Sequence, residues 1–211
     1  MPSFRTGTVV GILAERAGLQ RVSVDLGAGE PERAYVLTAL TGDVAAGDRV
    51  VVNTTAVELG LGTGGWHVVH WNLARDELRA PGPGHIVKLR YTSLQSDVGA
   101  AEELHPEVPT DLGGRPVVVC ALHSQVGVVA ALVGHLRPGT RVAYVMTDGA
   151  ALPLVLSDLV ATLTERGLLH GTVTAGHAFG GALEAVSVPS ALALAVHVAR
   201  ADVVVVGMGH E

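Results

Sequence analysis

The hydrophobic pattern of residues 4–72 consists of short Val-rich runs separated by turn residues. The runs are RTGTVVGILAE, QRVSVDLG, RAYVLTAL, DRVVVNTTAVEL and WHVVHWN, and the clearest separators are GAGEPE, TGDVAAGD and GLGTGG. Short apolar runs bounded by Gly, Pro, Asp and Asn are typical of strands, and no stretch here has the period of a good helix. Five closely spaced strands predict a small β-barrel, OB-like or SH3-like, over residues 1–80.

The period of the pattern changes after Arg115. The buried-strand runs PVVVCAL, RVAYVMT, GTVTAG and DVVVVGMG alternate with helical segments. This alternation indicates β-α units, so residues 115–211 are predicted to form a Rossmann-like domain with a parallel sheet. The middle helix is expected to have Pro153 in its first turn, Ser157 on its polar face and Gly167 beyond its end. The helices near 125–136 and 189–200 are apolar nearly all round and are expected to be covered on both sides, by the barrel, by an oligomer partner or by chain that is missing from the sequence.

Residues 81–114 separate the two patterns. The run PGPG breaks the barrel pattern, HIVKLRYTSLQ follows as an extended segment, and an acidic stretch leads to residue 114. In an extended segment alternate residues share a face, so Lys88 and Arg90 are expected to point to the same side. Lys88 is the only lysine of the chain. The junction therefore offers two cations to a neighbouring site.

Composition narrows the class of protein. Hydrophobic residues make up 48% of the 211 residues, whereas aromatic residues make up 3%, which favours a Val-, Leu- and Ala-rich α/β core.

The net charge of −6 without a basic cluster argues against nucleic-acid and anionic-lipid partners. Polar residues interrupt the longest apolar stretches, so no membrane span is expected. The single cysteine, Cys120, excludes an intrachain disulfide, and the start MPSFRTG lacks signal-peptide features, so a cytoplasmic location is expected.

The run GLGTGG at residues 60–65 fits the pattern G-x-G-x-x-G of dinucleotide-binding loops. That pattern works between a strand and a helix, whose amino end meets the pyrophosphate. Here the next run, WHVVHWN, is a predicted strand. We therefore expect a glycine-rich hairpin or bulge between two barrel strands, with an anion-binding nest as the alternative.

Polar and glycine residues gather where the predicted parallel strands end. The carboxyl ends of such strands share one edge of the sheet, outside which ligands bind. The candidate catalytic residues at this edge are His123, Asp148 and His177. The candidate ligand-binding residues are Ser124, Thr147, Gly149, Gly176, Gly180 and Gly181 from the strand ends, with Lys88 and Arg90 from the junction. Each residue taken singly also has a structural explanation as a helix cap or loop residue.

Three functions fit these residues. The first is binding of a small anionic metabolite or nucleotide at the sheet edge, with Asp148 and His177 as acid–base or orienting groups. The second is a noncatalytic interaction or structural module. The third is a metal-dependent hydrolase that uses His123, Asp148 and His177, although ligands on separate strands have no diagnostic spacing, so no metal is assigned. Ser124 lacks the G-x-S-x-G pattern of a serine hydrolase. No cofactor is identified, and the sequence leaves open whether the protein is an enzyme.

Four motifs occur in a fixed order: GLGTGG, PGHIVKLRYTSLQ, YVMTDGAALP and AFGGALEAV. In this combination the chain resembles a bacterial family of unknown function found especially in actinobacteria and their relatives. The resemblance spans nearly the whole chain and implies no established activity and no catalytic residues. Members of that family look longer, so the resemblance implies a shortened or truncated chain whose α/β domain is incomplete at the carboxyl end.

A homo-oligomer is the expected assembly. The sequence places the apolar strand run at 203–206 close to its last residue, and no helix that could cover the run follows it. Parallel sheets normally have both faces buried, and unpaired edges recruit other strands. Another copy is therefore expected to cover this strand or the helix near 189–200.

Overall fold

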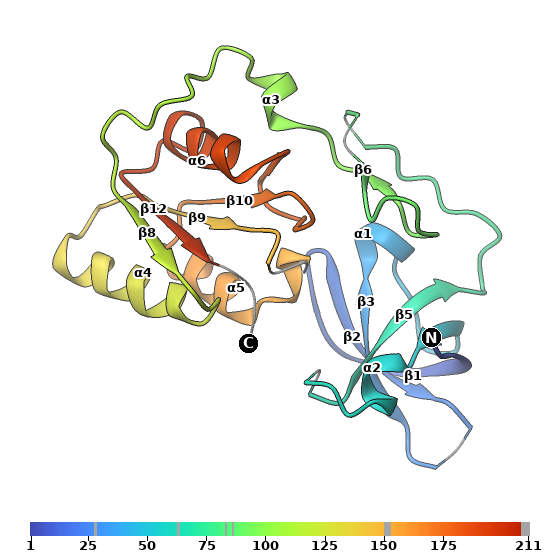
Figure 1. The fold of residues 1–211 in the computed structure, drawn as a ribbon. Helices are drawn as coiled ribbons and strands as arrows, with labels where there is room; N and C mark the ends of the chain where they lie inside the picture. Colours follow the sequence, from blue (N-terminus) through green and yellow to red (C-terminus); the bar gives the residue numbers. More distant parts are fainter. Residues whose placement is uncertain (28, 63, 83, 86, 150–152, 208–211) are drawn as a thin grey trace. The chain divides into compact units, whose positions relative to one another are not determined.

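The computed structural model describes residues 1–27, 29–62, 64–82, 84–85, 87–149 and 153–207. The chain divides into two compact units, Met1–Ala80 and Pro81–Glu211. The first is a closed β-barrel and the second is built around a parallel sheet (Figure 1). The protein is thus a mixed α/β chain, in which the predicted barrel and the predicted parallel sheet are both present.

Five strands close the barrel in the order β1-β2-β3-β5-β4. They are β1 (Phe4–Arg16), β2 (Leu19–Asp25), β3 (Glu32–Leu37), β4 (Arg49–Asn53) and β5 (Trp66–Asn72), one for each predicted run. All neighbours are antiparallel except β3 and β5, which are parallel. Two register shifts along β1 let this long strand pair with both β2 and β4. The core is aliphatic, as the composition requires.

Two short helices were not expected in the barrel, α1 (Thr38–Thr41) and α2 (Thr55–Glu58). Each has four residues, too few to give a helical period in the sequence. The glycine-rich run follows α2 and leads directly into strand β5 at Trp66. Gly60, Gly64 and Gly65 have positive φ angles of 66°, 63° and 76°. The prediction that this run opens no helix is confirmed, but the run joins helix α2 to strand β5 and does not join two strands directly.

All strands of the second sheet are parallel, in the order β11-β10-β9-β12-β8. They are β8 (Val117–Cys120), β9 (Val142–Met146), β10 (Gly171–Ala175), β11 (Leu183–Ala185) and β12 (Val203–Gly207). The last strand, β12, lies between β9 and β8. It is therefore an inner strand with both neighbours in place within the chain, and the homo-oligomer stays a prediction.

Helices cover both faces of this sheet (Figure 1). The α4 helix (Gln125–Leu136) and the α5 helix (Asp158–Glu165) belong to one core cluster, and α6 (Val188–His197) belongs to the cluster on the opposite face. Pro153 lies before the 3-10 turn η1 (Leu154–Leu156), not in the first turn of the middle helix. The helix begins at Asp158 because Ser157 is its N-cap and accepts the backbone N–H of Val160 at 3.1 Å.

The short strand β11 was missed because its three residues carry no detectable period. Only residues 176–182 connect β10 to β11, although the strands are parallel neighbours. Parallel strands usually need a crossover of a dozen or more residues. Gly176 and Gly180, with φ angles of 60° and 91°, allow the shorter return.

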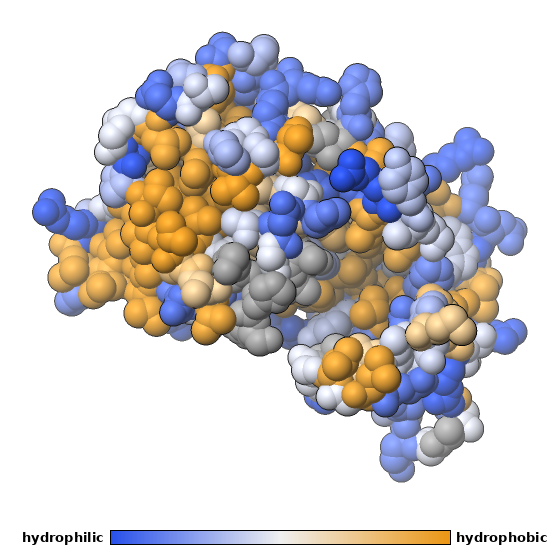
Figure 2. All heavy atoms as spheres, viewed as in Figure 1, coloured by the Kyte–Doolittle hydropathy of each residue, from blue (hydrophilic) through white to orange (hydrophobic). Residues whose placement is uncertain are grey.

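The two apolar helices differ in how far they are covered. The α6 helix is buried by the sheet and also by Val108 and Leu112, which pack against the same cluster. On α4, by contrast, Val128 is 70% exposed and Leu136 is 64% exposed. Figure 2 shows hydrophobic atoms gathered over the region of α4 and β8. The α6 helix is therefore covered on both sides as predicted, whereas one face of α4 is exposed in the single chain.

Candidate ligand-binding site at the carboxyl edge of the parallel sheet

The three candidate catalytic residues follow the carboxyl ends of three parallel strands. His123 comes after β8, Asp148 after β9 and His177 after β10. Because the strands are parallel, these residues lie at one edge of the sheet. They do not form one cluster, however. Asp148 and His177 share a pocket, and His123 is held elsewhere.

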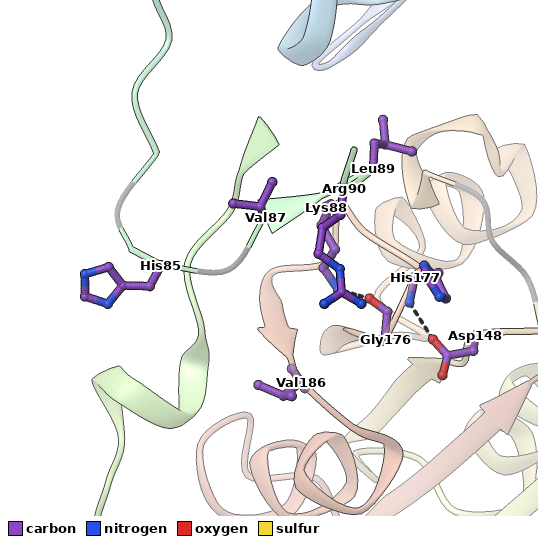
Figure 3. Close-up of a pocket in the computed structure, with 10 residues that line it drawn as sticks. His85, Val87, Lys88, Leu89, Arg90, Asp148, Gly176, His177 and Val186 are labelled. Carbon is purple, nitrogen blue, oxygen red and sulfur yellow. Dashed lines mark hydrogen bonds between the residues drawn. The ribbon is translucent and has the colours of Figure 1, made fainter. Parts of the chain in front are cut away.

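The pocket has a volume of ≈ 430 Å³, within the range of small-molecule sites. Segments around β6 (Val87–Lys88) form one wall, and residues at the carboxyl ends of β9, β10 and β11 form the other (Figure 3). The lining residues are His85, Val87, Lys88, Leu89, Arg90, Asp148, Gly176, His177, Ala185 and Val186. All of them belong to the second unit.

The chain around Lys88 differs from the extended segment predicted from the sequence. Strand β6 contains only two residues, and positive φ angles at Leu89 (52°) and Tyr91 (61°) turn the backbone. As a result Lys88 is 3% exposed, whereas Arg90 is an exposed residue. The predicted extended segment therefore ends at Lys88. Both line the pocket, but in different environments.

Lys88 anchors the short crossover after β10. Its Nζ donates to the carbonyl oxygens of Gly176 and Ala178, the latter at 2.9 Å, and lies 3.6 Å from Oε2 of Glu184. Glu184 accepts the Thr174 hydroxyl at 2.7 Å. Burial lowers the pKa of Lys88, while the nearby Glu184 charge opposes this shift. Burial likewise raises the pKa of Glu184, against the hydrogen bonds that favour its ionised form.

Arg90 and His177 line the pocket with side chains that could bind a ligand. Within the described part of the chain, neither the Arg90 guanidinium nor the His177 ring makes a hydrogen bond or an ion pair. The backbone N–H of His177 donates to Oδ1 of Asp148. Figure 3 shows these three side chains at the same pocket. A cation without a partner in a pocket is the arrangement expected of an anion site.

Two features of the structure require glycine at position 176. Its φ angle of 60° lies in the left-handed region, which L side chains rarely adopt. A Cβ atom at this position would also clash with Oδ1 of Asp148. The loop can approach the Asp148 carboxylate this closely only because residue 176 has no side chain.

Comparison with known proteins places the chain in a family. The family model "Protein of unknown function (DUF3866)" matches residues 33–210. The chain belongs to this family. No curated protein matches the sequence.

The DUF3866 match begins within β3 and includes every residue of the pocket. It confirms the resemblance noted from the four sequence motifs. The family description assigns no activity, so the roles of the pocket residues follow from their geometry alone. No helix among the described residues is long and apolar enough to span a membrane.

The remaining predicted ligand-binding residues of this DUF3866 chain lie outside the pocket. Gly180 and Gly181 donate their backbone N–H groups to Glu184 and Thr174, so these donors serve the crossover. Thr147 is buried and donates to the Gly207 carbonyl at 3.3 Å. Gly149 follows Asp148 in a turn, and Ser124 is exposed at the start of α4 without a side-chain cap bond.

The structure also adds lining residues that sequence reasoning missed. Ala185 and Val186 belong to the unpredicted strand β11 and the residue after it. His85 and Leu89 lie on either side of β6. No periodic signal marks such short elements, and only His85 and Leu89 could have been suspected, because they are close to Lys88 in the sequence.

His123 is bound on both ring nitrogens by residues of the α4–α5 side of the sheet. Its Nδ1 lies 2.9 Å from the Tyr144 hydroxyl oxygen, and its Nε2 lies 2.6 Å from Oγ of Ser157. The structure therefore does not bring His123 to Asp148 and His177 as three ligands of one metal. The described residues contain no group of three or more His, Cys, Asp or Glu side chains placed to hold a metal ion.

Proposed function

We propose that this pocket binds a small molecule with an anionic group, such as a phosphate or carboxylate, and a hydroxyl or amino group. The observation that carries the proposal is the Arg90 guanidinium, which lines the pocket and has no hydrogen bond or ion pair with any other residue that the structure describes. Arginine is suited to phosphate and carboxylate because its planar donors bind two oxygens at once. Nucleotides and sugar phosphates combine the required groups.

The other pocket residues have complementary roles in this proposal. The His177 ring has no hydrogen-bond partner among the residues that the structure describes and can donate to the same anion. Asp148 can accept from a hydroxyl or amino group of the ligand and, if a reaction occurs, act as its acid–base group. Lys88 is not a direct ligand here, because its ammonium serves the carbonyls of Gly176 and Ala178.

The fold supports the same location. We infer that the parallel sheet, with helices on both faces, is Rossmann-like, and ligands of such sheets bind outside the carboxyl ends of the strands. The barrel order β1-β2-β3-β5-β4 favours an OB-like over an SH3-like fold. Neither assignment names a ligand.

Calorimetry and thermal shift with defined anions test the proposal. The probes are inorganic phosphate, AMP, ATP and succinate, each titrated into the full chain and into the Arg90→Gln variant. A ligand of the folded state raises the melting temperature. Loss of a hydrogen bond to a charged group costs about 1.5–3 kcal/mol, so the Kd of a bound anion should rise roughly 10- to 150-fold in Arg90→Gln.

The matched control is Arg137→Gln, which removes an exposed arginine outside the pocket. This variant should keep the original Kd. If none of the probes binds at millimolar concentration, or if Arg90→Gln binds as tightly as the parent chain, the pocket is not an anion site of this kind.

A second candidate function is an interaction module. It is favoured by the exposed apolar residues of α4 together with Val119, which is 78% exposed on the edge strand β8. Uncovered apolar surface beside an open strand edge is typical of an association surface. In this proposal the surface associates with a second copy of the chain.

A further inference from the structure

Ser157, His123 and Tyr144 form a hydrogen-bonded row that the proposed anion site does not use. They come from three elements: the N-cap of α5, the residues after β8, and strand β9. The Ser157 Oγ to His123 Nε2 distance is 2.6 Å, and the His123 Nδ1 to Tyr144 Oη distance is 2.9 Å. None of the three lines the pocket around Arg90.

The helix cap explains only part of this arrangement. As N-cap, Ser157 accepts the backbone N–H of Val160 at 3.1 Å. A cap needs no imidazole, and its Oγ has a hydrogen left to donate. A serine that already accepts a backbone N–H can donate this hydrogen to Nε2 of His123. Ser157 and His123 are both half-buried rather than enclosed.

Tyr144 sets the orientation of the ring. The residue is fully buried, and burial raises its pKa, so the hydroxyl stays neutral. A neutral phenol oxygen can accept from the Nδ1–H of His123 and thereby leave Nε2 as the basic nitrogen. A nucleophile, a base within hydrogen-bond reach and a third group that orients the base are the three parts of an activated serine.

We propose that Ser157 is a nucleophile, that His123 is its general base and that Tyr144 positions the imidazole, so that this site transfers acyl groups from esters. The G-x-S-x-G pattern of a serine hydrolase is absent around Ser124. The proposed nucleophile is Ser157 at the start of α5, and its base His123 follows strand β8.

The reaction balances with these residues and water. The Ser157 Oγ bonds to the carbonyl carbon of the ester while its proton passes to Nε2 of His123. The bond from that carbon to the alcohol oxygen breaks, and the alcohol leaves with the proton from His123. Water then attacks the acyl-serine, its proton passes through His123 to Oγ, and a carboxylic acid leaves.

A fluorophosphonate probe tests the nucleophile without knowledge of the natural substrate. Oγ of an activated serine displaces fluoride and forms a stable bond to phosphorus, which peptide mass spectrometry locates. The full chain should be modified at Ser157. Ser124 is the internal control, since it also precedes a helix but makes no cap bond. The Ser157→Asn variant keeps a residue that can cap α5 and should lose the modification.

The His123→Ala variant distinguishes a catalytic base from a structural contact. General-base assistance contributes at least about a hundredfold, so the rate of labelling at Ser157 should fall by that factor, and added imidazole should restore part of it. Tyr144→Phe should slow labelling and keep the His123 dependence. Absence of label at Ser157 in the folded parent chain would overturn the proposal. So would an unchanged labelling rate in His123→Ala.

Discussion

The ion pair between Lys88 and Glu184 should determine whether the crossover after β10 stays folded. In the Lys88→Met variant the two loop carbonyls lose their donor and Glu184 loses its counter-charge. Removing one partner of a buried pair destabilises a protein by about 3–5 kcal/mol. With an m-value of about 2 kcal/mol/M, the urea midpoint of the α/β unit should fall by roughly 2 M.

The double variant Lys88→Met/Glu184→Gln separates the pair from the individual side chains. Glutamine keeps an oxygen that can accept from Gly180, but it has no charge to leave unpaired. The double variant should therefore be more stable than the sum of the single effects predicts, by about 1–3 kcal/mol. Arg137→Met, which removes an exposed arginine, is the control for loss of a positive charge alone.

The assay must follow the α/β unit by itself. Both tryptophans, Trp66 and Trp71, belong to the barrel, so their fluorescence reports the other unit. Hydrogen exchange of strands β10 and β11 measures the opening that the variants should promote. If the single effects add within about 0.5 kcal/mol, Lys88 and Glu184 act independently and the reasoning fails.

The same pair predicts a pH dependence with a definite sign. Burial raises the pKa of Glu184 above its ordinary value of 4.5, so the folded chain keeps this proton at a pH where the unfolded chain has lost it. The loss of Lys88 removes the charge that opposes this shift. The Lys88→Met variant should therefore be destabilised less at about pH 5, where Glu184 is closer to neutral, than at pH 7. Urea titrations at both values measure the difference.

Three further predictions concern other parts of the second unit. Gly176→Ala should destabilise the crossover by at least the ~1–2 kcal/mol of a left-handed residue and weaken anion binding in calorimetry, because its Cβ would strike Asp148. Leu132→Glu on the exposed face of α4 should lower self-association in sedimentation without unfolding the chain; an unchanged association constant excludes this face. The hydrogen bonds from Arg141 hold the pKa of Asp202 well below its usual value of 3.8. The Asp202→Asn variant should therefore be less stable than the parent chain at neutral pH, and acid-unfolding curves should show this difference vanish at strongly acidic pH.

The sequence predicts the parts of the fold that have a clear period or turn signal. The five barrel strands and four of the parallel strands correspond to Val-rich runs, and Gly60–Gly65 is correctly separated from dinucleotide loops by the strand that follows it. Strand β11 has three residues and no such signal. The start of α5 is displaced because Pro153 suits a first turn, whereas Ser157 provides the cap that the helix uses.

The candidate site shows the same limit at the level of side chains. Strand ends identify the edge that holds Asp148 and His177, because parallel strands share their direction. The strand ends do not show on which side of the sheet a side chain lies. His123 follows a strand at the same edge, yet it hydrogen-bonds Ser157 and not Asp148. On the predicted helix Ser157 is one more polar residue. Its relation to a histidine 34 positions earlier exists only in three dimensions.

Lys88 shows that a pattern along the sequence does not determine the environment of a side chain. In an extended strand Lys88 and Arg90 lie on the same face, but this relation applies only as far as the strand continues. The positive φ angle at Leu89 ends it after two residues, so one cation turns into the crossover and the other remains at the pocket. The buried ammonium then fixes the carbonyls of Gly176 and Ala178, and with them the loop that places His177 beside Arg90. In the proposed anion site Lys88 acts through this loop, so Lys88→Met should weaken anion binding in calorimetry although Arg90 is unchanged.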